Sequence, residues 1–193
     1  ERANKNDDDL FVDADIESGL GRRFDGAVTL PPMMAIAATG DALYAYEAGR
    51  ISAEESRAVG IHFNLSPVVD VNNNPKNPII NTRSFGEDPD SVYRYSIEYI
   101  KGLQNNGMLA TAKHFPGHGD TETDSHSSLA QIPSDSTRLW NVELEPFKKV
   151  IVAGVDAVMV AHVNAPDFQE HAENPATLSK FWIQYILKTK LEF

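Results

Sequence analysis

Short apolar runs alternate with longer segments of helical periodicity along the chain. Four runs rich in Val, Leu, Ile and Ala occupy residues 10–14, 61–69, 108–112 and 155–160. Each is followed by a segment with the apolar spacing of an amphipathic helix, at about 42–59, 88–103, 137–153 and 178–191. The pattern predicts four strands in strict alternation with four helices, at intervals of roughly 45 to 50 residues. Such alternation is typical of βαβ units and a parallel sheet.

Capping and turn residues mark the ends of these predicted helices. Asp41 follows a Thr-Gly turn and can cap the helix over 42–59, which Gly60 ends. Asp88 begins the next helix together with Pro89, because a proline at the first helical position loses no intrahelical hydrogen bond. The boundaries of the two central helices are therefore predicted by local chemistry as well as by periodicity.

Polar clusters follow each predicted strand. They occupy residues 15–23, 72–83, 113–126 and 162–167, and none of them follows a helix. In a parallel barrel or a doubly wound sheet, the loops after the strands share one face of the domain. The four clusters are therefore expected to converge on one site.

Composition narrows the classes of function. The chain has 193 residues, is 41% hydrophobic and carries a net charge of -11. A single domain is the simplest organisation for this length, and the strong acidity without a basic stripe argues against binding to nucleic acid or to an anionic membrane surface. There is no apolar run long enough for a membrane span. Cysteine is absent, so disulfides and thiolate metal sites are excluded, and the compartment stays open between cytoplasm and export.

The third cluster is the richest in ionisable side chains. Residues 113–126 read K-H-F-P-G-H-G-D-T-E-T-D-S-H and hold three of the six histidines. Crowded histidines and aspartates admit a metal-dependent hydrolase as one interpretation. The spacing argues against it, because His114 and His118 lie four apart across a Pro-Gly turn that cannot be helical. Proton transfer near neutral pH is the alternative that histidine chemistry favours.

The motifs together resemble those of glycoside hydrolase family 3, in its β-N-acetylglucosaminidase branch. The resemblance rests on the 113–126 segment and, in the same order as in that branch, on D-I-E-S-G-L-G-R-R-F, S-P-V-V-D-V-N-N-N-P, N-T-R-S-F-G-E-D-P and M-V-A-H-V, and it covers about residues 10 to 190. It implies an α/β fold of the (β/α)8 TIM-barrel type. It also implies hydrolysis of terminal, non-reducing β-linked N-acetylglucosamine with retention, on a small carbohydrate substrate and without cofactor or metal.

The resemblance also implies roles for individual residues. In this branch a histidine held by an aspartate two residues earlier acts as the acid/base, and these positions are His126 and Asp124 here. An imidazole can serve because it titrates near neutral pH, and a neighbouring carboxylate can fix its tautomer. The positions that match the sugar-binding residues of the family are Asp15, Arg23, Arg83, Lys113 and His114.

Two parts of the family pattern have no counterpart in the sequence. The nucleophile of the family is an aspartate on a strand expected after Phe193, and a first strand and helix are expected before Asp15. Residues 1–193 therefore correspond to about four of eight βα units, about half of a single barrel domain. Half a barrel exposes two strand edges, so the segment alone is expected to be marginally stable or to associate. Without the nucleophile it is also expected to be inactive, whereas the full-length enzyme is expected to be active.

Other functions stay open at the level of the sequence. A neutral imidazole would not repel an incoming phosphate as a carboxylate would, so a phosphorylase of the same branch is one alternative. A catalytically inactive sugar-binding fragment is another. The substrate is open among a muropeptide of peptidoglycan turnover, a chitooligosaccharide and a glycoconjugate.

Overall fold

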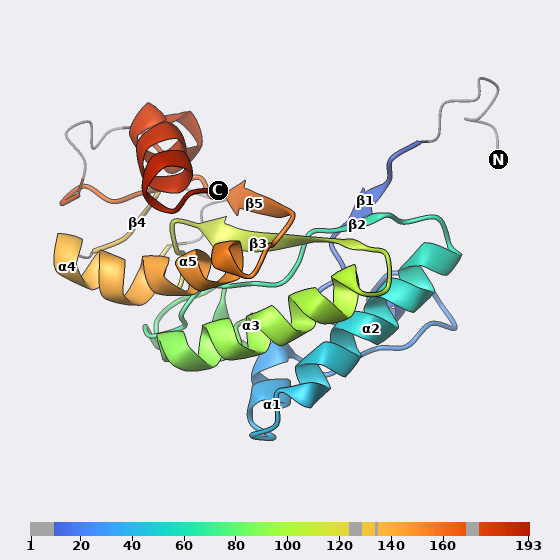
Figure 1. The fold of residues 1–193 in the computed structure, drawn as a ribbon. Helices are drawn as coiled ribbons and strands as arrows, with labels where there is room; N and C mark the ends of the chain where they lie inside the picture. Colours follow the sequence, from blue (N-terminus) through green and yellow to red (C-terminus); the bar gives the residue numbers. More distant parts are fainter. Residues whose placement is uncertain (1–9, 124–128, 134, 169–173) are drawn as a thin grey trace.

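The computed structural model describes residues 10–123, 129–133, 135–168 and 174–193. Its centre is a four-stranded parallel sheet with the strand order β1-β2-β3-β5 (Figure 1). The strands are β1 Asp13–Ala14, β2 Phe63–Asn64, β3 Leu109–Phe115 and β5 Ala157–Val160. The strands of this sheet lie side by side in chain order, as in a barrel wall, whereas a doubly wound sheet reverses its order at one point.

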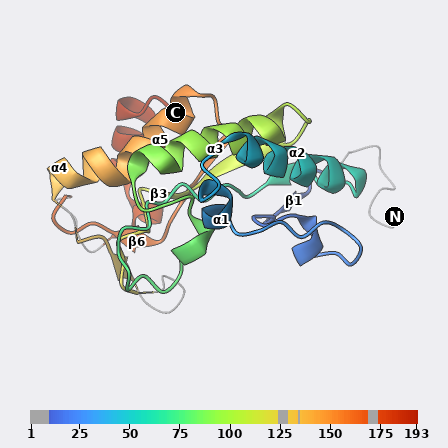
Figure 2. The ribbon, with the colours of Figure 1, turned by 90° about the horizontal axis from the view of Figure 1, so that it is seen from below.

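Helices occupy the connections between the strands. They are α1 Met33–Ala37, α2 Leu43–Ala58, α3 Pro89–Gln104, the continuous run α4 Ser136–Arg138, η3 Leu139–Glu143 and α5 Leu144–Val152, and the π-helical η5 Phe181–Lys190. Short 3₁₀ turns lie at η1 Leu20–Arg22, η2 Asn81–Arg83 and η4 Ala176–Leu178. Helices α2, α3 and α5 lie side by side against the sheet (Figures 1 and 2). The architecture is that of part of a TIM-type barrel, which confirms the predicted fold class.

The predicted helices are confirmed with small shifts at their ends. The Asp41 carboxylate accepts the N–H of Leu43 at 2.9 Å, at the first residue of α2. Asp88 caps α3 by accepting the N–H groups of Asp90 and Ser91 at 3.0 and 3.2 Å. These side chains satisfy donors that the first helical turn leaves without a partner.

All four predicted strands differ in length from the expectation. Strands β1 and β5 begin at Asp13 and Ala157, three and two residues later than predicted. The run over 61–69 pairs as a strand only at β2, because Pro67 has no N–H for the ladder; pairing resumes as a single bridge between Val68 and Lys113. Strand β3 instead continues to Phe115, three residues beyond its predicted end. The sequence analysis also missed a second, two-stranded parallel sheet of β4 Ala130–Gln131 and β6 Val163–Asn164.

The core between sheet and helices is apolar and tightly packed. Phe115 at the end of β3 contacts Phe147 of α5 and Trp182 of η5, with ring centroids 5.5 and 6.0 Å apart. All three rings are buried. The aromatic cluster joins the last two helices to the strand that bears the central polar segment.

None of the helices in the described part of the chain combines the length and the apolar character that a membrane span requires.

Two glycines allow α2 and α3 to pack closely. A Cβ at Gly49 would overlap the carbonyl oxygen of Tyr99, and a Cβ at Gly102 would overlap that of Tyr46. The backbones therefore meet where neither helix has a side chain. Any substitution at either glycine must push the two helices apart.

We predict that Gly102→Ala lowers the free energy of unfolding by about 1–3 kcal/mol, because overpacking forces the helices to shift. Lys101→Ala is the matched control, since Lys101 is exposed and its pair with Glu98 lies on the surface. Denaturant titration of both variants measures the effect. Equal stability of the two variants would show that the helix contact tolerates a methyl group.

Candidate active site

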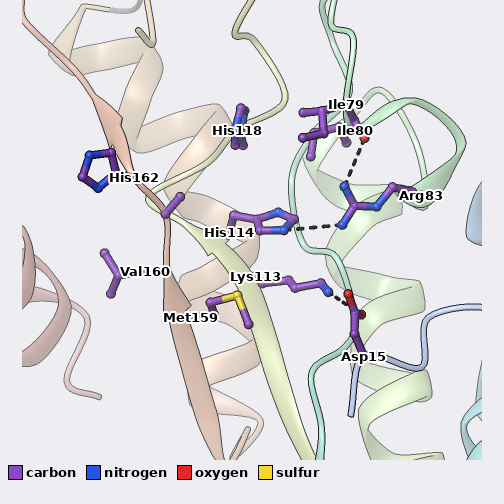
Figure 3. A pocket seen from close by; sticks show the side chains of 11 residues that line it. Asp15, Ile79, Ile80, Arg83, Lys113, His114, His118, Met159, Val160 and His162 are labelled. Carbon is purple, nitrogen blue, oxygen red and sulfur yellow. Dashed lines mark hydrogen bonds and ion pairs between the residues drawn. The ribbon is translucent and has the colours of Figure 1, made fainter. Parts of the chain in front are cut away.

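A pocket of about 320 Å³ opens at the carboxyl ends of the parallel strands (Figure 3). Residues from all four polar clusters line it, as the sequence analysis expects. Its wall is formed by Asp15, Ile79, Ile80, Arg83, Lys113, His114, His118, Met159, Val160, Ala161 and His162. The loops after four strands thus meet at one site, where barrels of this type place their chemistry.

A bulge in β3 aims two neighbouring side chains into this pocket. Lys113 pairs with Met159 and Phe115 pairs with Val160, so His114 is an extra residue between two steps of the ladder. Side chains alternate across a regular strand, and Lys113 and Phe115 would then share a face. Here Lys113 and His114 both line the pocket and Phe115 enters the core. The expectation that Lys113 and His114 lie in a loop is therefore wrong, because both belong to β3.

Lys113 carries a buried positive charge. Its side chain is 2% exposed, and Nζ lies 2.8 Å from Asp15 Oδ1 and 2.6 Å from Glu17 Oε1. An isolated ammonium in such a place would be strongly unfavourable, and removal of one partner from a buried pair is typically destabilising. The two carboxylates therefore fix the lysine at the pocket wall.

Glu17 connects this lysine to Arg83. Its carboxylate accepts both Arg83 Nε at 2.8 Å and Nη2 at 2.6 Å, the two-pronged geometry that a guanidinium favours. Burial by itself raises the pKa of Glu17, but the Arg83 hydrogen bonds and the nearby Lys113 charge outweigh it and lower the pKa to about 2. Glu17 is therefore ionised at any physiological pH.

Another carboxylate of the site, Asp70, contacts the ring of His114. This carboxylate is fully buried and lies 2.7 Å from Nδ1 of His114. It also accepts the backbone N–H of His118 at 2.7 Å. Burial raises the pKa of Asp70, yet the contacts with His114 and His118 outweigh burial and the pKa lies below its ordinary value. The aspartate is ionised and holds two segments of the pocket wall together.

Asn77 anchors the segment after β3. Its Nδ2 donates to the carbonyl oxygens of His118 at 2.8 Å and Gly119 at 3.1 Å, while its Oδ1 accepts the N–H groups of Ile79 and Ile80. A Cβ at position 119 would overlap the carbonyl oxygen of Val71, so this close approach requires glycine. The loops that follow β2 and β3 are thereby joined.

A second hollow of about 300 Å³ adjoins the pocket and shares Asp15 and Arg83 with it. Arg23 lines this second hollow, where its Nε donates to the Asp15 carbonyl oxygen at 3.2 Å. The structure therefore brings Asp15, Arg83, Lys113 and His114 together and places Arg23 beside them. The predicted dyad, Asp124 and His126, lies outside the described residues.

The sequence analysis missed two carboxylates of the site, Glu17 and Asp70. Glu17 follows Asp15 by two positions in the first polar cluster, which was a sequence signal for a second carboxylate. Asp70 interrupts the apolar run S-P-V-V-D-V, where a charged residue is unusual for a buried strand. Within the described portion of the chain, no three or more His, Cys, Asp or Glu side chains form a group that could hold a metal ion.

The lowered pKa of Glu17 predicts an acid-sensitive contribution to stability. A carboxyl group with a depressed folded-state pKa stabilises fully above its unfolded value of 4.5 and loses this effect as the pH falls through about 2. We expect Glu17→Gln to lower the free energy of unfolding above pH 5, and the deficit relative to wild type to shrink by about 3 kcal/mol toward pH 2. Glu87→Gln, at an exposed position, is the control. A deficit independent of pH would contradict the ion-pair interpretation.

Comparison with known proteins extends these observations. Residues 2–193 match the model of the glycosyl hydrolase family 3 N terminal domain. A beta-hexosaminidase of Stenotrophomonas maltophilia is 39% identical over 95% of this chain and 55% of its own length. This chain spans between 28% and 56% of the lengths of the curated relatives that it matches.

Solved structures agree with the family match. A family 3 beta-N-acetylglucosaminidase from Paenibacillus sp. str. FPU-7 superposes with a TM-score of 0.92 at 45% identity, over 96% of this chain and 35% of that one. A beta-glucoside phosphorylase, BglX, superposes with a TM-score of 0.89 at 28% identity, over 95% and 35% of the two chains. The chain therefore belongs to glycoside hydrolase family 3 and carries sequence of the N-terminal barrel domain of that family.

Proposed function

We propose that this chain is the sugar-binding part of a β-N-acetylglucosaminidase that removes terminal, non-reducing β-linked N-acetylglucosamine with retention. The observation that carries the proposal is the pocket, where loops from four strands bring donors and acceptors to one concave site. Its volume falls in the range of small-molecule sites. The beta-hexosaminidase and beta-N-acetylglucosaminidase relatives support the choice of substrate.

The charges of the pocket suit a neutral, hydroxyl-rich ligand. The Asp15 side chain is 44% exposed although Lys113 occupies one of its oxygens, so it can still accept hydrogen bonds from sugar hydroxyls. Lys113, Arg83 and Arg23 offer donors, and His114 presents a ring nitrogen beside Arg83. Because each ionic group is already paired with protein, the site can bind a neutral sugar without leaving a buried charge uncompensated.

Retention requires an acid/base and a nucleophile on opposite faces of the sugar. We assign the acid/base to His126, which would protonate the leaving oxygen. Asp124 would accept a hydrogen bond from the other ring nitrogen and thereby hold the imidazole in one orientation. This assignment is supported by the segment that leads to both residues, which is anchored in the pocket wall through His118 and Asn77. A carboxylate of the full-length protein would attack the sugar.

We expect His126→Ala in the full-length protein to reduce kcat on an aryl N-acetylglucosaminide by about 10²- to 10⁴-fold, because proton transfer to the leaving group is lost. Asp124→Asn should give a smaller loss and shift the pH profile of kcat. His62→Ala is the control, since His62 precedes β2 at the end of the sheet remote from the pocket. Binding of N-acetylglucosamine without turnover, unchanged in His126→Ala, would instead support a non-catalytic sugar-binding module.

A phosphorylase is the second candidate, and the likeness to BglX favours it. After proton donation, a neutral His126 would not repel phosphate, whereas a carboxylate would. Phosphate would then attack the glycosyl enzyme in place of water and yield the sugar 1-phosphate.

Whether water or phosphate attacks the glycosyl enzyme can be tested directly in the full-length protein. With millimolar phosphate, we expect N-acetylglucosamine 1-phosphate to form alongside free sugar, and His126→Glu to lose the phosphorylated product selectively. Product analysis by NMR or chromatography distinguishes free N-acetylglucosamine from its 1-phosphate. Hydrolysis without any sugar 1-phosphate would restrict the activity to a hydrolase.

A further inference from the structure

Asp70 occupies a position that no substrate could reach. It follows β2, its side chain is fully buried, and it does not line the pocket. Its two oxygens nevertheless accept three hydrogen bonds from pocket-wall residues: the His114 N–H at 3.2 Å, the His118 N–H at 2.7 Å and the His114 ring nitrogen Nδ1 at 2.7 Å. Since an ionised carboxylate only accepts, Nδ1 of His114 must carry a proton.

The other ring nitrogen of His114 has a fixed donor beside it. Nε2 lies 3.5 Å from Nη2 of Arg83, and a guanidinium can only donate. Arg83 cannot turn to avoid the ring, because Glu17 holds its Nε and Nη2 and the Ile79 carbonyl oxygen accepts its Nη1 at 3.1 Å. A proton on Nε2 would therefore face a donor and a positive charge.

We propose that Asp70 is a positioning residue that sets the tautomer of His114. Nδ1 of His114 carries the single ring proton and donates it to Asp70, and Nε2 carries a lone pair. The His114 ring lies at the pocket wall beside Arg83 (Figure 3). Nε2 of His114 is thereby a hydrogen-bond acceptor. An imidazole nitrogen has one lone pair, so, given the proposed function, a hydroxyl hydrogen of the terminal sugar replaces the 3.5 Å contact of Arg83 at Nε2, and Lys113 and Arg83 serve as donors to sugar oxygens.

An acceptor at Nε2 of His114 would affect which ligands the pocket binds. A site built to accept a hydroxyl hydrogen discriminates strongly against an analogue that lacks that hydroxyl, because a buried polar group is left unpaired. Acceptors at His114 and Asp15 alternate with donors at Arg83 and Lys113 along the pocket wall. The wall therefore matches hydroxyls that donate and accept in turn.

Asp70→Asn tests the tautomer directly. Asparagine keeps the shape and one oxygen, which can still accept the His118 N–H, but it puts an NH₂ group opposite Nδ1 of His114. The ring must then accept at Nδ1 and carry its proton on Nε2. Two-bond ¹H–¹⁵N NMR of histidine-labelled protein at neutral pH should show Nδ1–H in wild type and Nε2–H in the variant. Wild-type His114 protonated at Nε2, alone or at both nitrogens, would overturn the proposal whether or not the variant folds.

Kinetics of the full-length protein provide the functional readout. Asp70→Asn should raise KM for an aryl N-acetylglucosaminide by about 10-fold, with a smaller change in kcat. In a protein that already carries His114→Ala, the same substitution should raise KM little further. Asp156→Asn, which removes a carboxylate that contacts the same sheet but no histidine, is the control. An equal loss from Asp70→Asn in both backgrounds would show a merely structural role and overturn the proposal. If the protein does not cleave such substrates, the proposed function fails while the NMR result still decides the tautomer.

Discussion

The ammonium group of Lys113 is buried in the wall of the barrel, and the arrangement of the site follows from how that charge is compensated. Asp15 and Glu17 contact it, and Glu17 also holds Arg83. Hydrogen bonds then continue from the arginine to a histidine and from there to a buried aspartate. The complete path across the ends of the parallel strands is Asp15, Lys113, Glu17, Arg83, His114 and Asp70. Negative and positive groups alternate from Asp15 to Arg83, and His114 then connects Arg83 to Asp70, so each charge has a compensating or hydrogen-bonded neighbour.

The fold provides what this path requires. Parallel strands in sequential order end at the same edge, so residues far apart in the chain meet there. The bulge at His114 allows two consecutive side chains to face the pocket while Phe115 anchors the strand in the aromatic cluster. On the other side, the glycine contact between α2 and α3 keeps the helical layer close to its neighbours. Rigid packing behind the strands therefore fixes the geometry in front of them.

Much of this arrangement is predictable from the sequence, and the exceptions have physical causes. Periodicity and caps predict helices and strands, because these depend on neighbours in the chain. The break at Pro67 and the extension of β3 depend on which strand lies alongside, and that is a tertiary property. Motif resemblance points to Asp15, Arg83, Lys113 and His114, which line the pocket. It does not identify Glu17 and Asp70, because their role appears only once their partners, distant in the chain, are placed beside them.

We propose that a preformed, internally paired set of charges receives the terminal sugar. A structure of the full-length protein with N-acetylglucosamine bound would decide this. We expect sugar hydroxyls within hydrogen-bond distance of Asp15, Lys113 and Nε2 of His114, with the Glu17 to Arg83 pair unchanged. A sugar bound elsewhere, or one that displaces Glu17 from Arg83, would contradict it.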